Sequence, residues 1–155
     1  MSHEQPVTVR DVQPGDEAAW RLLYSGYRAF YALPDNDVAV DTTWGWVSRR
    51  EHGLRGLVAV DADGVVVALA HVRVFARPSS GRMGLYLDDL FTDPDRRGRG
   101  AARALLEHIA VLAGDEGVNV VRWITARDNA PARRVYDTHA TLTPFVTYDM
   151  APRSG

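Results

Sequence analysis

The chain has 155 residues, of which 46% are hydrophobic and 25% are charged, and its formal net charge is −2. This length and composition indicate one folded domain of ordinary size and exclude a disordered chain. The slightly negative charge excludes the basic surface of nucleic-acid-binding and membrane-surface proteins, and no apolar run reaches the about 18 residues that a membrane-spanning helix needs.

Two residue types are missing, because cysteine is absent and all 18 basic residues are arginine. The lack of cysteine excludes disulfides, thiolate nucleophiles and thiolate metal sites. The lack of lysine excludes Schiff-base chemistry and a Walker-type phosphate loop. Residues 1–6 have neither the basic region nor the apolar core of a signal peptide, so we expect a cytoplasmic protein.

The first part of the chain predicts one strand followed by two helices. Residues 7–10 alternate between apolar and polar side chains, as a half-buried strand does. Apolar residues then recur at helical spacing over residues 17–31, and a weaker helical pattern covers residues 38–51.

The middle of the chain predicts an antiparallel meander of three strands, over residues 57–61, 65–75 and 83–92. The pair Asp63-Gly64 supplies the left-handed conformation that a tight hairpin needs. A turn rich in proline, serine and glycine separates the second strand from the third.

The last part predicts a long helix that ends near residue 113 and a nearly continuous apolar strand at 118–125, typical of a central strand covered on both faces. A short helix at 129–138 and an extended region at 141–150 follow. This order predicts an α/β fold with a mixed sheet and helices on both faces. We expect a single domain over residues 1–155, with loose tails at 1–5 and 152–155.

The junction between the third meander strand and the long helix is the first motif. Asp93-Pro94-Asp95 ends the strand, and the helix opens with Arg97-Gly98-Arg99-Gly100-Ala101-Ala102. A helix N-terminus presents unpaired N–H groups and a positive dipole end, and glycine lets a phosphate approach the backbone. The motif therefore predicts a phosphate site, with an ordinary glycine loop as the alternative. A dinucleotide-binding fingerprint is disfavoured, because Gly-x-Gly-x-x-Gly is absent.

The second motif is Asn129-x-x-Ala132-x-x-x-Tyr136, whose spacing places all three residues on one face of the last helix. Their conventional interpretation is a helix cap, a packing contact and a buried aromatic residue.

Together, the two motifs resemble those of the GNAT family of N-acetyltransferases, whose order of elements matches residues 7–150. The first motif resembles the acetyl-CoA pyrophosphate loop, and the second resembles the fourth helix. The stretch from Tyr86 to Pro94 also looks like the Leu-Glu-Asp-Leu/Phe-Phe/Tyr-Val pattern of the diamine and polyamine acetyltransferase branch, with Asp88 in place of glutamate. The resemblance implies a GNAT-type acyl-CoA N-acyltransferase fold with about six to seven strands and four helices.

The resemblance also implies direct transfer of acetyl from acetyl-CoA to a primary amine in a ternary complex, without a metal. The absence of a cysteine that could carry an acyl group agrees with this. The acceptor would be a polyamine-like small molecule or a lysine side chain, and the protein a homodimer. The cofactor-binding residues implied are Leu90, Phe91, Thr92, Arg97, Gly98, Arg99, Gly100, Ala101, Ala102, Asn129 and Arg133.

Two residues are the implied catalytic groups. Asp88, directly or through a water, would take the proton of the ammonium, and Tyr136 would protonate the leaving thiolate. Successive residues of a regular strand point to opposite faces, so we expect only one of Asp88 and Asp89 to line the cleft. We favour Asp88, which should share a face with Tyr86 and Leu90. A solvated or arginine-paired carboxylate is the alternative for each.

The acceptor side is less well defined. Aromatic and acidic residues of the first two helices would suit a cationic amine, although an ordinary core and a solvated acidic loop are equally compatible; they are Tyr27, Tyr31, Asp35, Asp37, Asp41, Trp44 and Trp46. His71 could face the substrate, but a satisfied core histidine is the more conventional interpretation. The alternative functions are a non-catalytic acyl-CoA-binding module and an antibiotic or peptide N-terminal acetyltransferase.

Overall fold

The computed structural model describes residues 6–155. They fall into an N-terminal unit that ends at Ile124 and a C-terminal unit from Thr125 to Gly155, which we describe separately. The expected loose tail at residues 1–5 lies outside the described residues. None of the helices in the described part of the chain is long and apolar enough to cross a membrane.

The N-terminal unit contains a five-stranded mixed sheet in the order β1-β2-β3-β4-β5. The strands are β1 (Thr8–Asp11), β2 (Leu54–Val60), β3 (Val66–Arg77), β4 (Arg82–Thr92) and β5 (Val121–Arg122). The first four pair antiparallel, and β5 pairs parallel to β4. The predicted meander is thus confirmed, and Gly64 of its first hairpin has the expected positive φ of 81°.

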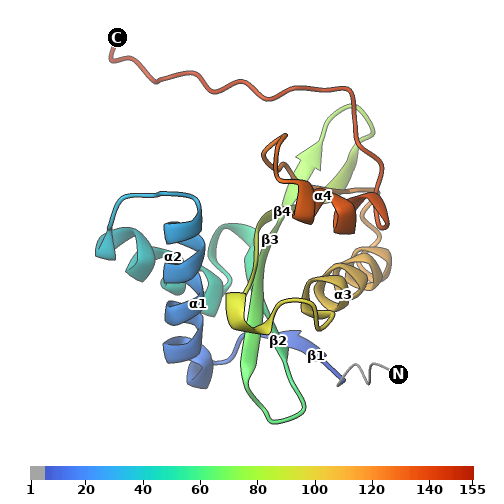
Figure 1. Cartoon of the computed structure of the whole chain (residues 1–155). Coiled ribbons are helices and arrows are strands. Elements are labelled where there is room, and N and C mark those ends of the chain that lie inside the picture. Colours follow the sequence, from blue (N-terminus) through green and yellow to red (C-terminus); the bar gives the residue numbers. More distant parts are fainter. Residues whose placement is uncertain (1–5) are drawn as a thin grey trace. The chain divides into compact units, whose positions relative to one another are not determined.

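Helices cover both faces of this sheet, as the sequence predicts. Helices α1 (Glu17–Phe30) and α2 (Asp37–Arg49) lie on one side, and α3 (Ala101–Asp115) lies on the other (Figure 1). Short 3-10 turns occur at η1 (Pro14–Asp16), η2 (Glu51–Gly53) and η3 (Pro94–Arg96).

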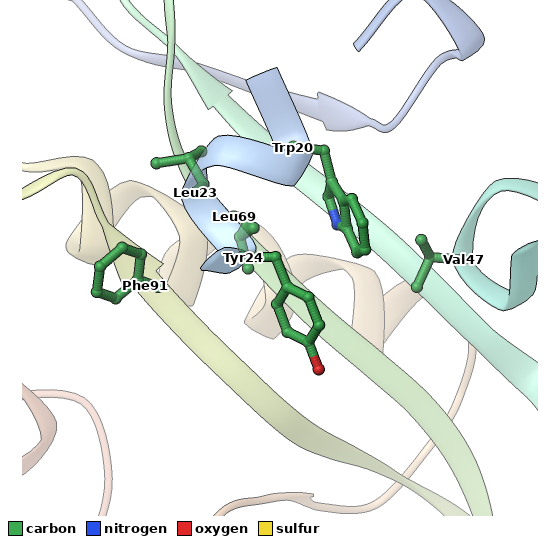
Figure 2. Close-up of a cluster of buried hydrophobic side chains, with 6 residues drawn as sticks. All are labelled: Trp20, Leu23, Tyr24, Val47, Leu69 and Phe91. Carbon is green, nitrogen blue, oxygen red and sulfur yellow. The ribbon is translucent and has the colours of Figure 1, made fainter. Parts of the chain in front are cut away.

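A hydrophobic cluster fills the space between α1, α2 and the sheet (Figure 2). Its buried members are Trp20, Leu23, Tyr24, Val47, Leu69 and Phe91. Trp20 is 0% exposed and stacks on Tyr24, with ring centroids 5.0 Å apart. Helix α1 approaches β4 closely at Gly26, where an added Cβ would lie 2.9 Å from the Phe91 ring. Burial of each large side chain contributes about 1.5–3 kcal/mol, so this cluster fixes α1 on the sheet.

The end of the sheet differs from the sequence-based expectation. Residues 118–125 were expected to form a central strand, but β5 has only two residues and lies at the sheet edge. Ile124 is 63% exposed. The prediction was wrong because an apolar run indicates burial but does not specify a partner, and the β4–β5 ladder ends at Tyr86 and Arg122.

The C-terminal unit contains α4 (Ala130–Asp137), which confirms the expected short helix. The Asn129 side chain caps it, since Oδ1 accepts a hydrogen bond from the N–H of Ala132 at 3.4 Å. Residues 141–155 are exposed, and within the described chain they form no strand. The described sheet therefore has five strands instead of the six to seven expected.

Candidate active site

The turn between β4 and α3 is open to an anion. Gly98 and Gly100 have φ values of 78° and 84°, and Gly100 is the N-cap of α3. No side chain caps the helix, and its first turn contains no acidic residue. The first N–H groups of an α-helix have no partner within it, so those at Ala101 and Ala102 can donate to a phosphate. These features fit a phosphate group, which the resemblance predicts to be the pyrophosphate of acetyl-CoA.

The three arginines of this turn have different surroundings. Arg96 Nη1 lies 2.9 Å from the carboxylate of Asp61, so this side chain is held in an ion pair. The Arg97 guanidinium lies over two aromatic rings, 5.6 Å from the centroid of Phe30 and 5.9 Å from that of Phe91. Arg97 and Arg99 are both exposed. Arg97 and Arg99 are therefore the two that can turn toward a bound phosphate.

Strand β4 has a β-bulge at Asp88, the candidate base. In the β3–β4 ladder, His71 pairs with Asp89, but the next residue of β3, Val72, pairs with Leu87. Asp88 is therefore an extra residue without an opposite partner on β3. A bulge of this kind bends the strand and changes the direction of its side chains.

The bulge corrects the expected facing of the two aspartates. Asp88 bonds to Arg73 and Asp89 bonds to His71, and these two β3 residues lie on the same face of their strand. Both carboxylates therefore face α1 and α2, and the expectation that they point to opposite faces is wrong. Leu90, opposite Ala70, is on the other face.

Asp88 is an arginine-paired carboxylate whose side chain is 29% exposed. Its Oδ2 accepts a hydrogen bond from Arg73 Nε at 2.9 Å, and the Arg73 guanidinium lies 4.7 Å from the ring centroid of Tyr86. Burial raises the pKa of Asp88, and the bond to Arg73 only partly opposes this. A raised pKa makes Asp88 a better proton acceptor than an ordinary surface aspartate.

The pKa of Asp89 is shifted in the opposite direction. Burial acts to raise its pKa, but hydrogen bonds from His71 and Tyr27 outweigh that effect and hold the pKa below its ordinary value. His71 Nδ1 lies 2.8 Å from Asp89 Oδ2, and His71 Nε2 accepts the indole N–H of Trp20 at 2.9 Å. His71 is 1% exposed and satisfied at both nitrogens, as its conventional interpretation predicts.

The outer edge of β4 is open beside these carboxylates. The ladder to β5 pairs only Leu85 and Tyr86, so β4 has no strand partner on that side from Leu87 onward in the described structure. Asp93 donates its N–H to Val67 of β3 at 2.9 Å. Because N–H groups alternate in direction along a strand, Leu90 directs its N–H toward the open edge and Phe91 toward β3. This favours Leu90 over Phe91 as a donor to an acyl carbonyl.

The aromatic residues of the acceptor side do not form one wall. Tyr27 stacks with Tyr24 and contacts Tyr31, with ring centroids 5.6 and 4.8 Å apart. Trp44 packs against the hydrophobic cluster. Trp46 contacts His52 instead, at 5.2 Å. Of these residues, Tyr27 extends from the core toward the Asp89 carboxylate, to which it donates a hydrogen bond.

The acidic residues of the same region also differ from one another. Asp41 forms an ion pair with Arg21 at 2.7 Å. Asp35 and Asp37 are exposed. The solvated-loop alternative thus describes these two residues, whereas Asp88 and Asp89 carry the negative charge on the face of β4 that is turned toward α1.

The remaining sequence-predicted residues belong to the C-terminal unit. Asn129 is the α4 cap, and Arg133 donates to the carbonyl oxygen of Arg127 at 2.7 Å. Tyr136 lies in the last turn of α4, and its carbonyl oxygen accepts the N–H groups of His139 and Ala140. Their functional roles remain predictions. Among residues 6–155, no group of three potential ligands lies close enough together to hold a metal ion.

The fold and the turn define a protein class that binds acyl-CoA and transfers its acyl group. Residues 20–140 match the model of the acetyltransferase (GNAT) family. The chain therefore belongs to this family and is an N-acetyltransferase.

Two curated relatives are similar in sequence. The D-amino-acid N-acetyltransferase of Saccharomyces cerevisiae is 27% identical over 96% of this chain and 97% of its own length. The mycothiol acetyltransferase of Beutenbergia cavernae is 30% identical over 86% of this chain, which spans only 43% of that enzyme.

Solved structures share the fold at lower identity. The ribosomal-protein-alanine N-acetyltransferase of Brucella melitensis has a TM-score of 0.78 at 19% identity, over 96% of this chain and 100% of its own. The structure of AAC(6')-Iy with the bisubstrate analog CoA-S-monomethyl-acetylneamine has a TM-score of 0.77 at 19% identity. The match covers 96% of this chain and 99% of that chain. At this identity, the likeness supports the fold alone.

Proposed function

We propose that this enzyme transfers acetyl from acetyl-CoA to the primary amine of a polyamine-like cation or a lysine side chain, by direct attack in a ternary complex. One observation carries the proposal: the bulge turns two carboxylates of β4 to the same face, and the same strand leads into the open phosphate turn. The carboxylates of β4 thus complement the positive charge of an ammonium group. The turn that follows the strand complements the negative charge of an acyl-CoA phosphate.

Acetyl-CoA supplies an activated thioester when bound. We propose that the backbone N–H groups of the 97–102 turn hold its pyrophosphate, assisted by Arg97 and Arg99. The open-edge N–H of Leu90 would donate to the acyl oxygen as negative charge develops there, with Thr92 continuing that edge. In the C-terminal unit, Asn129 and Arg133 would contact the pantetheine and phosphate portions.

The proton transfers need one base and one acid. Asp88 would accept a proton from the ammonium, directly or through a water, which frees the nitrogen lone pair for attack on the acyl carbon. Its raised pKa supports this role. As the carbon–sulfur bond breaks, Tyr136 would give its hydroxyl proton to the thiolate sulfur. The nitrogen loses a second proton as the amide forms, and this proton restores the Tyr136 hydroxyl through solvent. The proton on Asp88 is released to solvent, so the products are the amide, CoA as its thiol and one proton.

A D-amino acid is a second candidate acceptor, favoured by the full-length similarity to the yeast enzyme. Such a substrate carries a carboxylate beside its amine. Arg73 is partly exposed next to Asp88 and could pair with that carboxylate, whereas a polyamine has no group for it.

An acceptor panel tests the proposal. Release of CoA should be measured with acetyl-CoA and spermidine, thialysine, lysine peptides, an aminoglycoside and several D-amino acids. Turnover with the first three supports the proposal, and turnover only with D-amino acids supports the second candidate. Binding of acetyl-CoA without turnover of any amine would contradict both.

We also propose that the two units act together as one domain and that the enzyme is a homodimer. The family match spans both units, which supports the single domain. Within the C-terminal segment, Phe145 is 83% exposed and Tyr148 is 90% exposed. Large apolar side chains at this exposure are typical of a surface that a partner covers, and a second copy is the partner that the family resemblance suggests.

A further inference from the structure

The protonation state of His71 follows from its hydrogen-bond partners. The indole nitrogen of Trp20 can only donate, and it lies 2.9 Å from His71 Nε2. Nε2 must therefore be the unprotonated nitrogen, and a neutral ring carries its proton on Nδ1. A proton on Nε2 would oppose the Trp20 N–H in a site where His71 is 1% exposed.

This tautomer determines which hydrogen bond His71 makes to Asp89. With its proton on Nδ1, His71 donates to Asp89 Oδ2 across 2.8 Å. The Tyr27 hydroxyl is a second donor to the same carboxylate. Both donors favour the ionised form of the Asp89 carboxylate. Asp89 therefore stays a net negative charge.

We propose that Trp20 and His71 are positioning residues that keep Asp89 permanently ionised as the anchor of the substrate ammonium, so that Asp88 is the carboxylate that exchanges protons. This inference rests on the proposed function. It extends that function, because two adjacent carboxylates with opposite environments take different roles. The Asp89 charge attracts the cation, and the less stabilised Asp88 accepts its proton.

The groups around Asp89 come from three elements. His71 faces it from β3, Tyr24 and Tyr27 face it from α1, and Asp88 precedes it on β4. Of these, His71 is the one that donates through a nitrogen fixed by a third residue. Without that donor, the pKa of Asp89 should rise, since burial and the neighbouring Asp88 charge both favour protonation.

Two substitutions of His71 separate positioning from packing. In His71→Asn, the side-chain amide can donate from the place of Nδ1, whereas His71→Leu has a similar size and no donor. Both variants remove the acceptor of the Trp20 N–H, and this loss is therefore the same in the two. The readout is the pH dependence of kcat/KM for the best amine of the panel, with melting temperatures as a folding control.

We expect His71→Leu to shift the acid limb toward neutral pH by about one unit and to raise the amine KM more than it lowers kcat. His71→Asn should restore an acid limb close to that of the wild type. Equal pH profiles for the two variants would overturn the inference. Absence of turnover by the wild type would instead refute the proposed function, and with it the substrate role of Asp89.

A second measurement observes the His71 ring of the wild type directly. Nitrogen-15 spectra of the wild-type His71 ring, assigned by its loss in His71→Asn, report the protonation of each nitrogen. We expect Nε2 to be the unprotonated nitrogen, because it accepts the Trp20 N–H, and Trp20→Phe should abolish that preference. A charged ring, or a proton on Nε2, would overturn the inference.

Discussion

The guanidinium of Arg96 lies 2.9 Å from the carboxylate of Asp61, which joins the phosphate turn to the hairpin between β2 and β3. Asp61 also accepts N–H groups from Val65 and Asp63, and these bonds contribute to a pKa below its ordinary value. One end of the turn is thus held by a side chain, while Arg99 of the same turn is exposed.

Substitutions of Arg99 and Arg103 should therefore differ in their effect on the affinity for acetyl-CoA. Arg99→Ala should raise the dissociation constant about tenfold at low salt, because a charge-assisted phosphate contact is lost. The difference should shrink at high ionic strength. Arg103→Ala, an exposed position of α3 beyond the turn, is the matched control. Isothermal titration calorimetry measures both, and equal effects would contradict a phosphate site at the turn.

Asp88→Asn should lower kcat by about 100-fold or more, since general-base catalysis is typically worth a factor of this size. Asp88→Glu should retain most of the activity, because it restores the carboxylate that the diamine acetyltransferase pattern has at this position. Steady-state release of CoA over a range of pH provides the comparison. If the amide variant were as active as the glutamate variant, another group would be the base.

Tyr136→Phe should lower turnover near neutral pH by about 100-fold, because it removes only the hydroxyl proton donor. Binding of acetyl-CoA, measured by calorimetry, should change little, since the ring remains. A parallel loss of binding and turnover would assign Tyr136 a packing role instead of an acid role.

The ion pair between Arg10 and Asp16 should make stability depend on pH. The Arg10 guanidinium donates to Asp16 at 2.7 and 3.0 Å, the N–H of Gln13 adds a bond of 2.7 Å, and Asp16 is 7% exposed. These bonds, the one from Arg10 foremost, hold the pKa of Asp16 below its ordinary value. A lowered pKa contributes stability above the ordinary carboxyl pKa, which is lost as pH falls through the folded value.

Asp16→Asn should consequently cost about 1–3 kcal/mol of unfolding free energy at pH 7. The difference from the wild type should shrink below about pH 4. Urea unfolding at several pH values measures this, and Asp63→Asn serves as an exposed control. A difference that stayed constant from pH 7 to pH 3 would rule out the ion pair as its source.

Replacement of both Phe145 and Tyr148 by serine should shift the proposed dimer toward monomer. Their exposed rings contact little within the chain, so stability of the monomer should be nearly unchanged. Light scattering after size-exclusion chromatography gives the mass of each form. A wild type that is monomeric at high concentration would contradict the dimer proposal.

Much of the fold was predictable from local sequence patterns. Period-two alternation and the Asp63-Gly64 turn predict the meander, and helical spacing predicts α1, α2 and α3. The phosphate turn is also local, because a strand, two glycines with positive φ and a helix start follow one another within a few residues. The family assignment rests on such contiguous motifs together with the order of elements.

The length of β5 could not be read from the sequence in this way. An apolar run specifies burial, whereas a strand needs a partner whose hydrogen bonds come from a distant segment. The ladder with β4 ends at Arg122, and no local property of residues 118–125 marks that position.

The sequence by itself determined the family, the phosphate turn and the carboxylates at positions 88 and 89. The tertiary structure decided what those carboxylates do, because one unpaired residue in β4 turns both toward α1. It also supplied the partners that differentiate them, since His71 lies 18 positions from Asp89, and Trp20 lies 51 positions from His71. Contacts at such separations arise from strand register and helix packing, which no local pattern encodes.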